Sequence, residues 1–227
     1  GADASNYTLL HPTSLTADIT RADLAVTGLS AENKVYDATT LASLSGTAAI
    51  TALGVDAVSL SGTAAGAFAD KNVADDKAVT VSGLSLGGAD ATNYTLLHPT
   101  SLTADITRAD LAVTGLSAEN KVYDTTTSAS LSGTAAIKSQ GSDTVTLDGT
   151  AAGAFADKNV ADAKEVTVNG LTLAGVDATN YTLIHPTSLT ADITRADLAV
   201  TGLNADNKVY DTSTLASLSG TAAISAL

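Results

Sequence analysis

One stretch of 35 residues occurs three times in the 227-residue chain with few changes, at 3–37, 90–124 and 177–211. In the middle copy it reads DATNYTLLHPTSLTADITRADLAVTGLSAENKVYD. The equivalent tyrosines Tyr7, Tyr94 and Tyr181 are separated by 87 residues each, without insertion. A period this constant is typical of tandem arrays in which every repeat is one structural unit. We therefore expect an extended repeat protein.

The period divides the chain into four parts. Residues 1–20 are interpreted as the C-terminal strands of a preceding repeat, 21–107 and 108–194 as complete repeats, and 195–227 as the N-terminal part of a following repeat. An 87-residue unit can bury a modest core of its own. No Gly-, Pro- or Ser-rich linker separates the repeats. Because short junctions couple neighbouring units closely, we expect a stiff rod.

Short segments of alternating apolar and polar residues run through each repeat. In the first 20 residues, Leu15, Ala17 and Ile19 alternate with polar residues, and Asn6-Tyr7-Thr8-Leu9 reads as the start of a strand. In the long apolar patterns the phase shifts at a glycine, Gly83 or Gly170, which predicts a β-bulge. The pair Asn169-Gly170 would alternatively form a tight hairpin turn.

About seven short strands in 87 residues predict an all-β fold. The leading interpretation is a tandem array of antiparallel β-sandwich units of immunoglobulin-like size. Residues 39–50 are rich enough in Ala for a helical turn, which would give a β-grasp-like α+β unit instead. Since much of the apolar content is Ala and Val, we expect thin cores built from small side chains.

The net charge of −13 is spread evenly along the array. Residues 21–107 carry four Lys or Arg against nine Asp or Glu, and residues 108–194 carry five against ten. An evenly acidic chain repels phosphate backbones and anionic lipids, so nucleic acid is not an expected partner. No run of 18 apolar residues is present, so direct membrane insertion is not expected. The absence of Cys excludes disulfides and thiolate metal sites.

Histidine is the one conventional metal ligand that recurs, as His11, His98 and His185, each before a proline. A zinc site needs three or four converging ligands, and each repeat offers a single His and no Cys. These histidines are therefore assigned structural roles. No G-x-S-x-G turn is present to mark a nucleophile, and we expect no enzymatic activity.

Calcium is the only cofactor for which the sequence offers candidates, namely Asp70, Asp75 and Asp76 in the stretch DKNVADD. Carboxylate oxygens on loops suit this ion. The second repeat has Ala163 in place of Asp76, which removes one ligand. The alternative is that these carboxylates are solvated turn residues.

Four motifs together resemble the YDG/MBG-type tandem repeats of large secreted and surface adhesins of Gram-negative bacteria, which are filamentous haemagglutinin-like. The motifs are KVYDATT at 34–40, FADKNV at 68–73, KAVTVSGLSLGGADATNYTL at 77–96 and LTADIT at 102–107. The chain departs from the family at one position, because the Gly after Tyr-Asp is replaced by Ala38, Thr125 and Thr212. The resemblance implies a mostly β stalk module of an exported protein, without catalytic residues.

Three functions remain open from the sequence. The first is a structural stalk of a bacterial extracellular adhesin, projecting a binding tip from the cell surface. The second is a repeat segment whose copies self-assemble into an extracellular filament or biofilm matrix through exposed strand edges. The third is a glycan- or protein-binding module, against which the low aromatic content of 4% argues. The expected partners are neighbouring repeats of the same chain and other copies of it.

Overall fold

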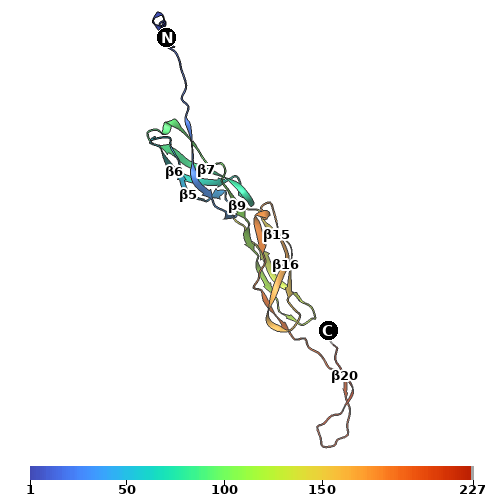
Figure 1. Ribbon diagram of the computed structural model, residues 1–227. Helices are drawn as coiled ribbons and strands as arrows, with labels where there is room; N and C mark the ends of the chain where they lie inside the picture. The colour runs from blue at the N-terminus through green and yellow to red at the C-terminus, as the bar shows by residue number, and fades with distance from the viewer. Residues whose placement is uncertain (226–227) are drawn as a thin grey trace. The chain divides into compact units, whose positions relative to one another are not determined.

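The chain is an all-β protein in a computed structural model that describes residues 1–225 (Figure 1). It divides into two compact units. Unit 1 consists of Gly1–Lys34 and Thr39–Thr107, and unit 2 consists of Val35–Ala38 and Arg108–Leu227. The short segment Val35–Ala38 is therefore part of unit 2, although the residues on both sides of it belong to unit 1.

Helical structure in residues 1–225 is limited to three single 3₁₀ turns, η1 (Ala4–Asn6), η2 (Ala91–Asn93) and η3 (Ala178–Asn180). Within that range, no helix has the length and apolar character needed to cross a membrane. Residues 39–50, where the sequence left a helical turn open, contain strands instead. The β-grasp-like alternative with a helix is thereby set aside.

Unit 1 begins with residues 1–21, which form no strand and run as a single trace without a neighbouring strand (Figure 1). The strands that follow are β1 (Ala22–Ala25), β2 (Thr27–Ala31), β3 (Lys34–Val35), β4 (Leu41–Ala42), β5 (Leu44–Ala49), β6 (Ser59–Phe68), β7 (Ala74–Gly87), β8 (Tyr94–Leu97) and β9 (Thr103–Thr107). Five of them form one sheet in the order β3-β9-β7-β6-β4. Two further pairs, β2-β5 and β1-β8, complete the unit. The long neighbours β6 and β7 are antiparallel and lie side by side in Figure 1.

Unit 2 repeats this arrangement with the same pairings. Its strands are β10 (Ala109–Ala112), β11 (Thr114–Ala118), β12 (Lys121–Val122), β13 (Ser128–Ala129), β14 (Leu131–Ala136), β15 (Thr146–Phe155), β16 (Ala161–Ala174), β17 (Tyr181–Ile184), β18 (Thr190–Thr194), β19 (Thr201–Ala205) and β20 (Leu218–Ala223). The five-stranded sheet has the order β12-β18-β16-β15-β13, with the pairs β11-β14 and β10-β17 beside it. The hairpin β19-β20 ends the described chain.

Two expectations about the strands need correction. The pairs β1-β8 and β12-β18 are parallel, so the units are not purely antiparallel. Residues 7–10 are exposed and outside any strand, although the equivalent Tyr94–Leu97 forms β8. Tyr94–Leu97 pairs with β1, whereas no strand in the described part of the chain pairs with residues 7–10.

The predicted β-bulges are confirmed. The register of β6 and β7 shifts between Gly62 and Ala65, and Gly83 lies opposite this shift with a φ of +81°. A Cβ atom on Gly83 would lie 2.3 Å from the carbonyl oxygen of Thr63, which leaves no room for any other residue. Asn169-Gly170 lies inside β16, so this pair forms a bulge and not a hairpin turn.

The cores are small, as the composition predicts. In unit 2, Phe155, Val166 and Ile193 form one buried cluster together with Ala129 and Ala191. Partly buried apolar side chains, among them Leu131 and Leu189, pack against that cluster. In unit 1 the equivalent Phe68, Val79 and Ile106 are likewise buried, so each unit has apolar side chains buried within it.

Candidate functional site

The Lys-Val-Tyr-Asp segment of each copy folds into a loop held by its own lysine. In unit 2, Lys121 Nζ donates to Asp124 Oδ1 at 2.7 Å and to the carbonyl oxygens of Thr126 and Ser128 at 2.9 and 3.0 Å. The ammonium group also lies 5.7 Å from the centre of the Phe155 ring, a cation–π distance. The hydrogen bond from Lys121 is the main cause that lowers the pKa of Asp124 to about 2.

The same loop recurs in the other two copies. Lys34 Nζ donates to the carbonyl oxygen of Thr39 at 2.9 Å and lies 5.6 Å from the Phe68 ring centre. Lys208 Nζ reaches Asp211 Oδ1 at 2.8 Å and the carbonyl oxygen of Ser213 at 3.0 Å. In all three copies the lysine Nζ therefore donates to the carbonyl oxygen of the residue five positions further along the chain.

The residue after Tyr-Asp has a positive φ in all three copies, at 62° for Ala38, 69° for Thr125 and 63° for Thr212. The turn therefore keeps the left-handed backbone for which glycine is best suited, despite the loss of that glycine. A β-branched residue such as Thr125 is strained in this conformation.

An Asn–Asp clamp joins the start of this loop to β9. Asn33 Nδ2 donates to Asp105 Oδ2 at 2.9 Å, and the backbone N–H of Asp105 donates back to Asn33 Oδ1 at 2.7 Å. The second carboxylate oxygen of Asp105 accepts from the backbone N–H of Asp76 at 2.9 Å. Unit 2 has the same clamp between Asn120 and Asp192. No local pattern in the sequence signals these pairs, because their members lie 72 residues apart.

Unit 2 contains a buried tyrosine site. The hydroxyl groups of Tyr36 and Tyr181 both donate to Asp143 Oδ2, at 2.6 and 2.7 Å. The two rings meet edge to face, with centres 5.3 Å apart and planes at 76°. Gln140 donates two hydrogen bonds to this site. Its side-chain Nε2 donates to the Tyr36 carbonyl oxygen at 3.1 Å, and its backbone N–H donates to the Tyr181 hydroxyl at 2.9 Å. Only 1% of Tyr36 is exposed.

Burial and Asp143 together change the acidity of this site. Desolvation is the largest cause that raises the pKa of Tyr181 to about 12, followed by the hydrogen bond to Asp143. In unit 1 the equivalent Tyr94 also has a raised pKa, but there the hydrogen bond to Asp56 is the largest cause. The difference reflects Tyr36, which covers Tyr181 in unit 2.

Comparison with protein families agrees with these repeated loops. The model of the YDG domain matches residues 20–104 and 107–191. The chain belongs to the YDG domain family. It contains two tandem YDG domains, which account for most of its length. Searches of curated proteins and of solved structures returned no match.

The calcium candidates lie in the first YDG domain but are used in other ways. Asp70 Oδ1 accepts from Lys77 Nζ at 2.7 Å and from the backbone N–H of Asn72 at 2.8 Å, and the lysine is the main cause that lowers the pKa of Asp70. Asp76 serves the clamp through its backbone N–H and has a φ of +51°, which explains why Ala163 can replace it in the second domain. Asp75 is exposed. In residues 1–225 no three His, Cys, Asp or Glu side chains come together as metal ligands.

The histidines of the YDG domains lie apart from this loop. His98 and His185 are half-buried, and each has a buried Nδ1 atom without a hydrogen-bond partner in the described chain. His98 lines a shallow hollow with Val26, Leu97 and Pro99. His11 is exposed in the strand-free segment. The structure does not bring the three histidines together as a site.

Proposed function

We propose that the tandem YDG domains form an acidic stalk of an extracellular bacterial protein, which holds a binding segment away from the cell surface. One observation carries this proposal: the same domain, with its own buried core, is repeated at a constant period without a linker. Repetition of a self-contained unit makes the span of an array depend on copy number and not on any single residue.

The use of the polar residues supports a structural role. Asp70, Asp105 and Asp124 each accept hydrogen bonds that hold a loop or turn of their own domain. We propose no catalytic role for the domains, because these carboxylates serve the fold. The evenly distributed negative charge of −13 would keep neighbouring stalks apart.

The aromatic residues favour a stalk over a glycan-binding module. Sugar recognition commonly relies on an exposed ring, whereas the rings of Phe68, Phe155 and Tyr94 are buried. Tyr36 and Tyr181 are buried against each other in unit 2. Most of the aromatic surface of the chain is therefore used inside the domains.

The test is the span of arrays with different copy numbers. One or two additional copies of residues 108–194 are inserted after residue 194, and isolated particles are imaged by electron microscopy at low concentration. The longest strands have 14 residues, which corresponds to about 45 Å at roughly 3.3 Å per residue. We expect each inserted copy to add a constant length of about 40 Å. Particles that grow in width, or whose length varies freely, would refute the stalk.

A further inference from the structure

Two phenols of unit 2 share one carboxylate. The hydroxyl groups of Tyr36 and Tyr181 both donate to Asp143 Oδ2, at 2.6 and 2.7 Å. Their oxygen atoms therefore lie within one hydrogen bond of the same acceptor, and the ring carbons ortho to the hydroxyls, the Cε atoms, converge on it as well. The ring centres are 5.3 Å apart, a distance at which two aromatic rings are in direct contact.

Asp143 is placed to accept the proton that a phenol loses on oxidation. A neutral phenol gives up an electron readily when its proton leaves at the same time, and that proton needs a base within hydrogen-bond reach. Tyr181 is a neutral phenol near pH 7, because desolvation and the hydrogen bond to Asp143 raise its pKa to about 12. Asp143 is itself only half-buried, so a proton taken from either ring can pass on to solvent.

The composition of the chain makes tyrosine its main oxidisable side chain. Cys and Met, which oxidants attack readily, are absent, and so is Trp. Only 1% of Tyr36 and 5% of Tyr181 is exposed, so solvent reaches these rings poorly. An electron can leave a buried ring by tunnelling through the protein, and the oxidant need not enter the site. The neighbouring ring is then the nearest reaction partner of a tyrosyl radical.

We propose that a one-electron oxidant joins Tyr36 to Tyr181 by a carbon–carbon bond between ortho ring carbons, which makes the pair a dityrosine. Each tyrosine gives one electron to the oxidant and one proton to Asp143, which releases it to solvent. The two radicals combine at their Cε atoms. Each of these carbons then loses its proton while the phenol oxygen gains one, which restores both aromatic rings. The site thus gives up two electrons and two protons in total, which hydrogen peroxide, acting through a peroxidase, takes up to form two molecules of water.

The bond would act in this chain as a disulfide does in chains that contain Cys. It would connect two residues that are far apart in the sequence, and a cross-link that closes a long loop removes conformational freedom from the unfolded chain. The folded state of unit 2 would be stabilised as a result. The inference goes beyond the stalk proposal, because it assigns a covalent modification to unit 2 whatever the span of the array.

The test treats the full chain with a peroxidase and hydrogen peroxide at low protein concentration. Exposed tyrosines would join chains to one another, so the starting chain carries Tyr7→Phe and Tyr210→Phe, at positions that are 81% and 87% exposed. It should remain monomeric, become lighter by the mass of two hydrogen atoms and show the blue fluorescence of dityrosine. After unfolding and cleavage at Lys and Arg, the peptides 35–71 and 165–195 should be recovered as one cross-linked species.

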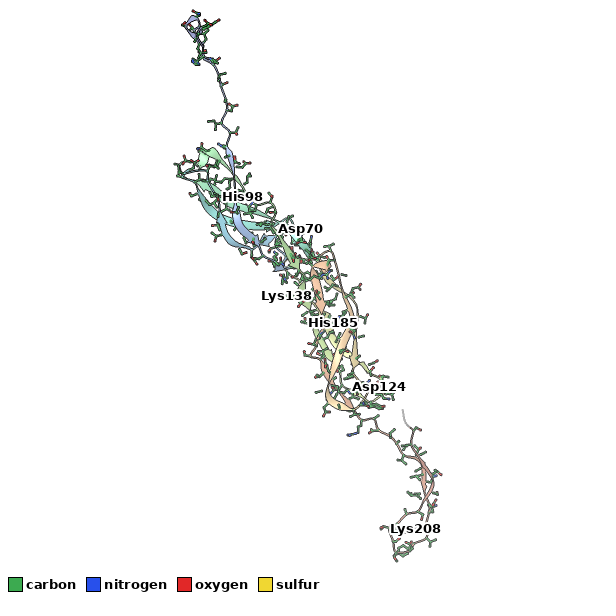
Figure 2. All side chains as sticks on the ribbon, viewed as in Figure 1. Asp70, His98, Asp124, Lys138, His185 and Lys208 are labelled. Carbon is green, nitrogen blue, oxygen red and sulfur yellow. The ribbon has the colours of Figure 1, made fainter. Side chains whose placement is uncertain are left out.

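Two tyrosine variants assign the product. Tyr36→Phe keeps the ring and removes the phenol, so the product should be lost completely. The matched control is Tyr123→Phe, at the equivalent position of the second copy, which should form the product like the starting chain. Figure 2 shows Lys138, two residues before Gln140, well apart from Asp124, which follows Tyr123. The control therefore removes a phenol of unit 2 outside the site.

A third variant tests the carboxylate. Asp143→Asn keeps an oxygen that accepts from both hydroxyl groups but cannot take up their protons, and it should slow formation of the product about a hundredfold, as loss of a general base does. An Asp143→Asn chain that reacts as fast as the starting chain would overturn the inference.

Three other results would overturn it as well. These are a starting chain that forms no cross-link, a product that persists in Tyr36→Phe, and a bond that joins other tyrosines. A product that forms in urea as readily as in the native chain would also do so, because the folded site is what brings the two rings together. None of these outcomes changes the length added per copy on single particles, so failure of this inference is distinguishable from failure of the stalk proposal.

Discussion

Removal of the Tyr36 hydroxyl is the most direct test of how unit 2 is stabilised. Tyr36→Phe deletes one hydrogen bond of 2.6 Å to Asp143 from a residue that is 1% exposed. Hydrogen bonds to charged groups contribute about 1.5–3 kcal/mol. Because Asp143 Oδ2 still accepts from Tyr181, the carboxylate is not left without a partner, and the lower end of this range applies. We expect a loss of about 1.5 kcal/mol in the free energy of unfolding of unit 2.

Tyr36→Ala additionally removes the ring that packs edge to face on Tyr181. Deletion of a buried aromatic side chain costs about 3–5 kcal/mol, so unit 2 should lose about 4 kcal/mol or more. Water would then reach Tyr181, whose pKa should fall from about 12 toward its ordinary value of 10.0, since desolvation is the main cause of the shift. Phenolate absorbance during an alkaline titration measures this change.

Native-state hydrogen exchange distinguishes the two units in one experiment. The N–H of Val166 donates to the carbonyl oxygen of Leu189 at 2.8 Å in unit 2, and the N–H of Val79 makes the equivalent bond to Leu102 in unit 1. Tyr36→Phe should accelerate exchange at Val166 about tenfold and leave Val79 unchanged. Tyr7→Phe, at an exposed position, should change neither amide. Unchanged protection at Val166, or an equal loss at both amides, would refute the reasoning.

Three further perturbations test the loop and the bulge. Thr125→Gly should stabilise the second domain by about 1 kcal/mol in urea denaturation, because glycine adopts the φ of +69° without strain. A destabilised variant would show that the positive φ does not strain Thr125. Lys121→Met should return the pKa of Asp124 from about 2 toward 3.8, as followed by carboxyl NMR. Since the folded pKa of Asp124 is depressed, its contribution to stability is present above about pH 4 and is lost as the pH falls through 2. This pH dependence should weaken in the variant, in which only the hydrogen bonds from Thr126 still lower the pKa. Gly83→Ala should destabilise the first domain by about 3 kcal/mol in the same denaturation assay, because the new Cβ atom would lie 2.3 Å from a carbonyl oxygen. The control Gly1→Ala should be neutral, because a Cβ atom there has no other atom within 4 Å.

Local features of the chain could be predicted from the sequence with good success. Alternation of apolar and polar residues identified β7, and the phase shift at Gly83 identified the bulge opposite β6. Both signals depend on residues close together in the chain. In a strand, every second side chain lies on the same face of the sheet, so a period of two residues identifies which side chains share a face. The clamp of Asn33 and Asp105 carried no such signal, because each residue alone resembles an ordinary turn residue.

The sequence by itself determined the repeat and the all-β character of the chain. These features depend on local backbone preferences and on contacts between near neighbours. Only the tertiary structure decided that β1 pairs in parallel with β8 and that Tyr36 meets Asp143, 107 residues further along the chain. Alternation specifies the faces of a strand and leaves its partner and direction open. Those are set when distant segments close around one core, where every buried donor and acceptor must find a partner.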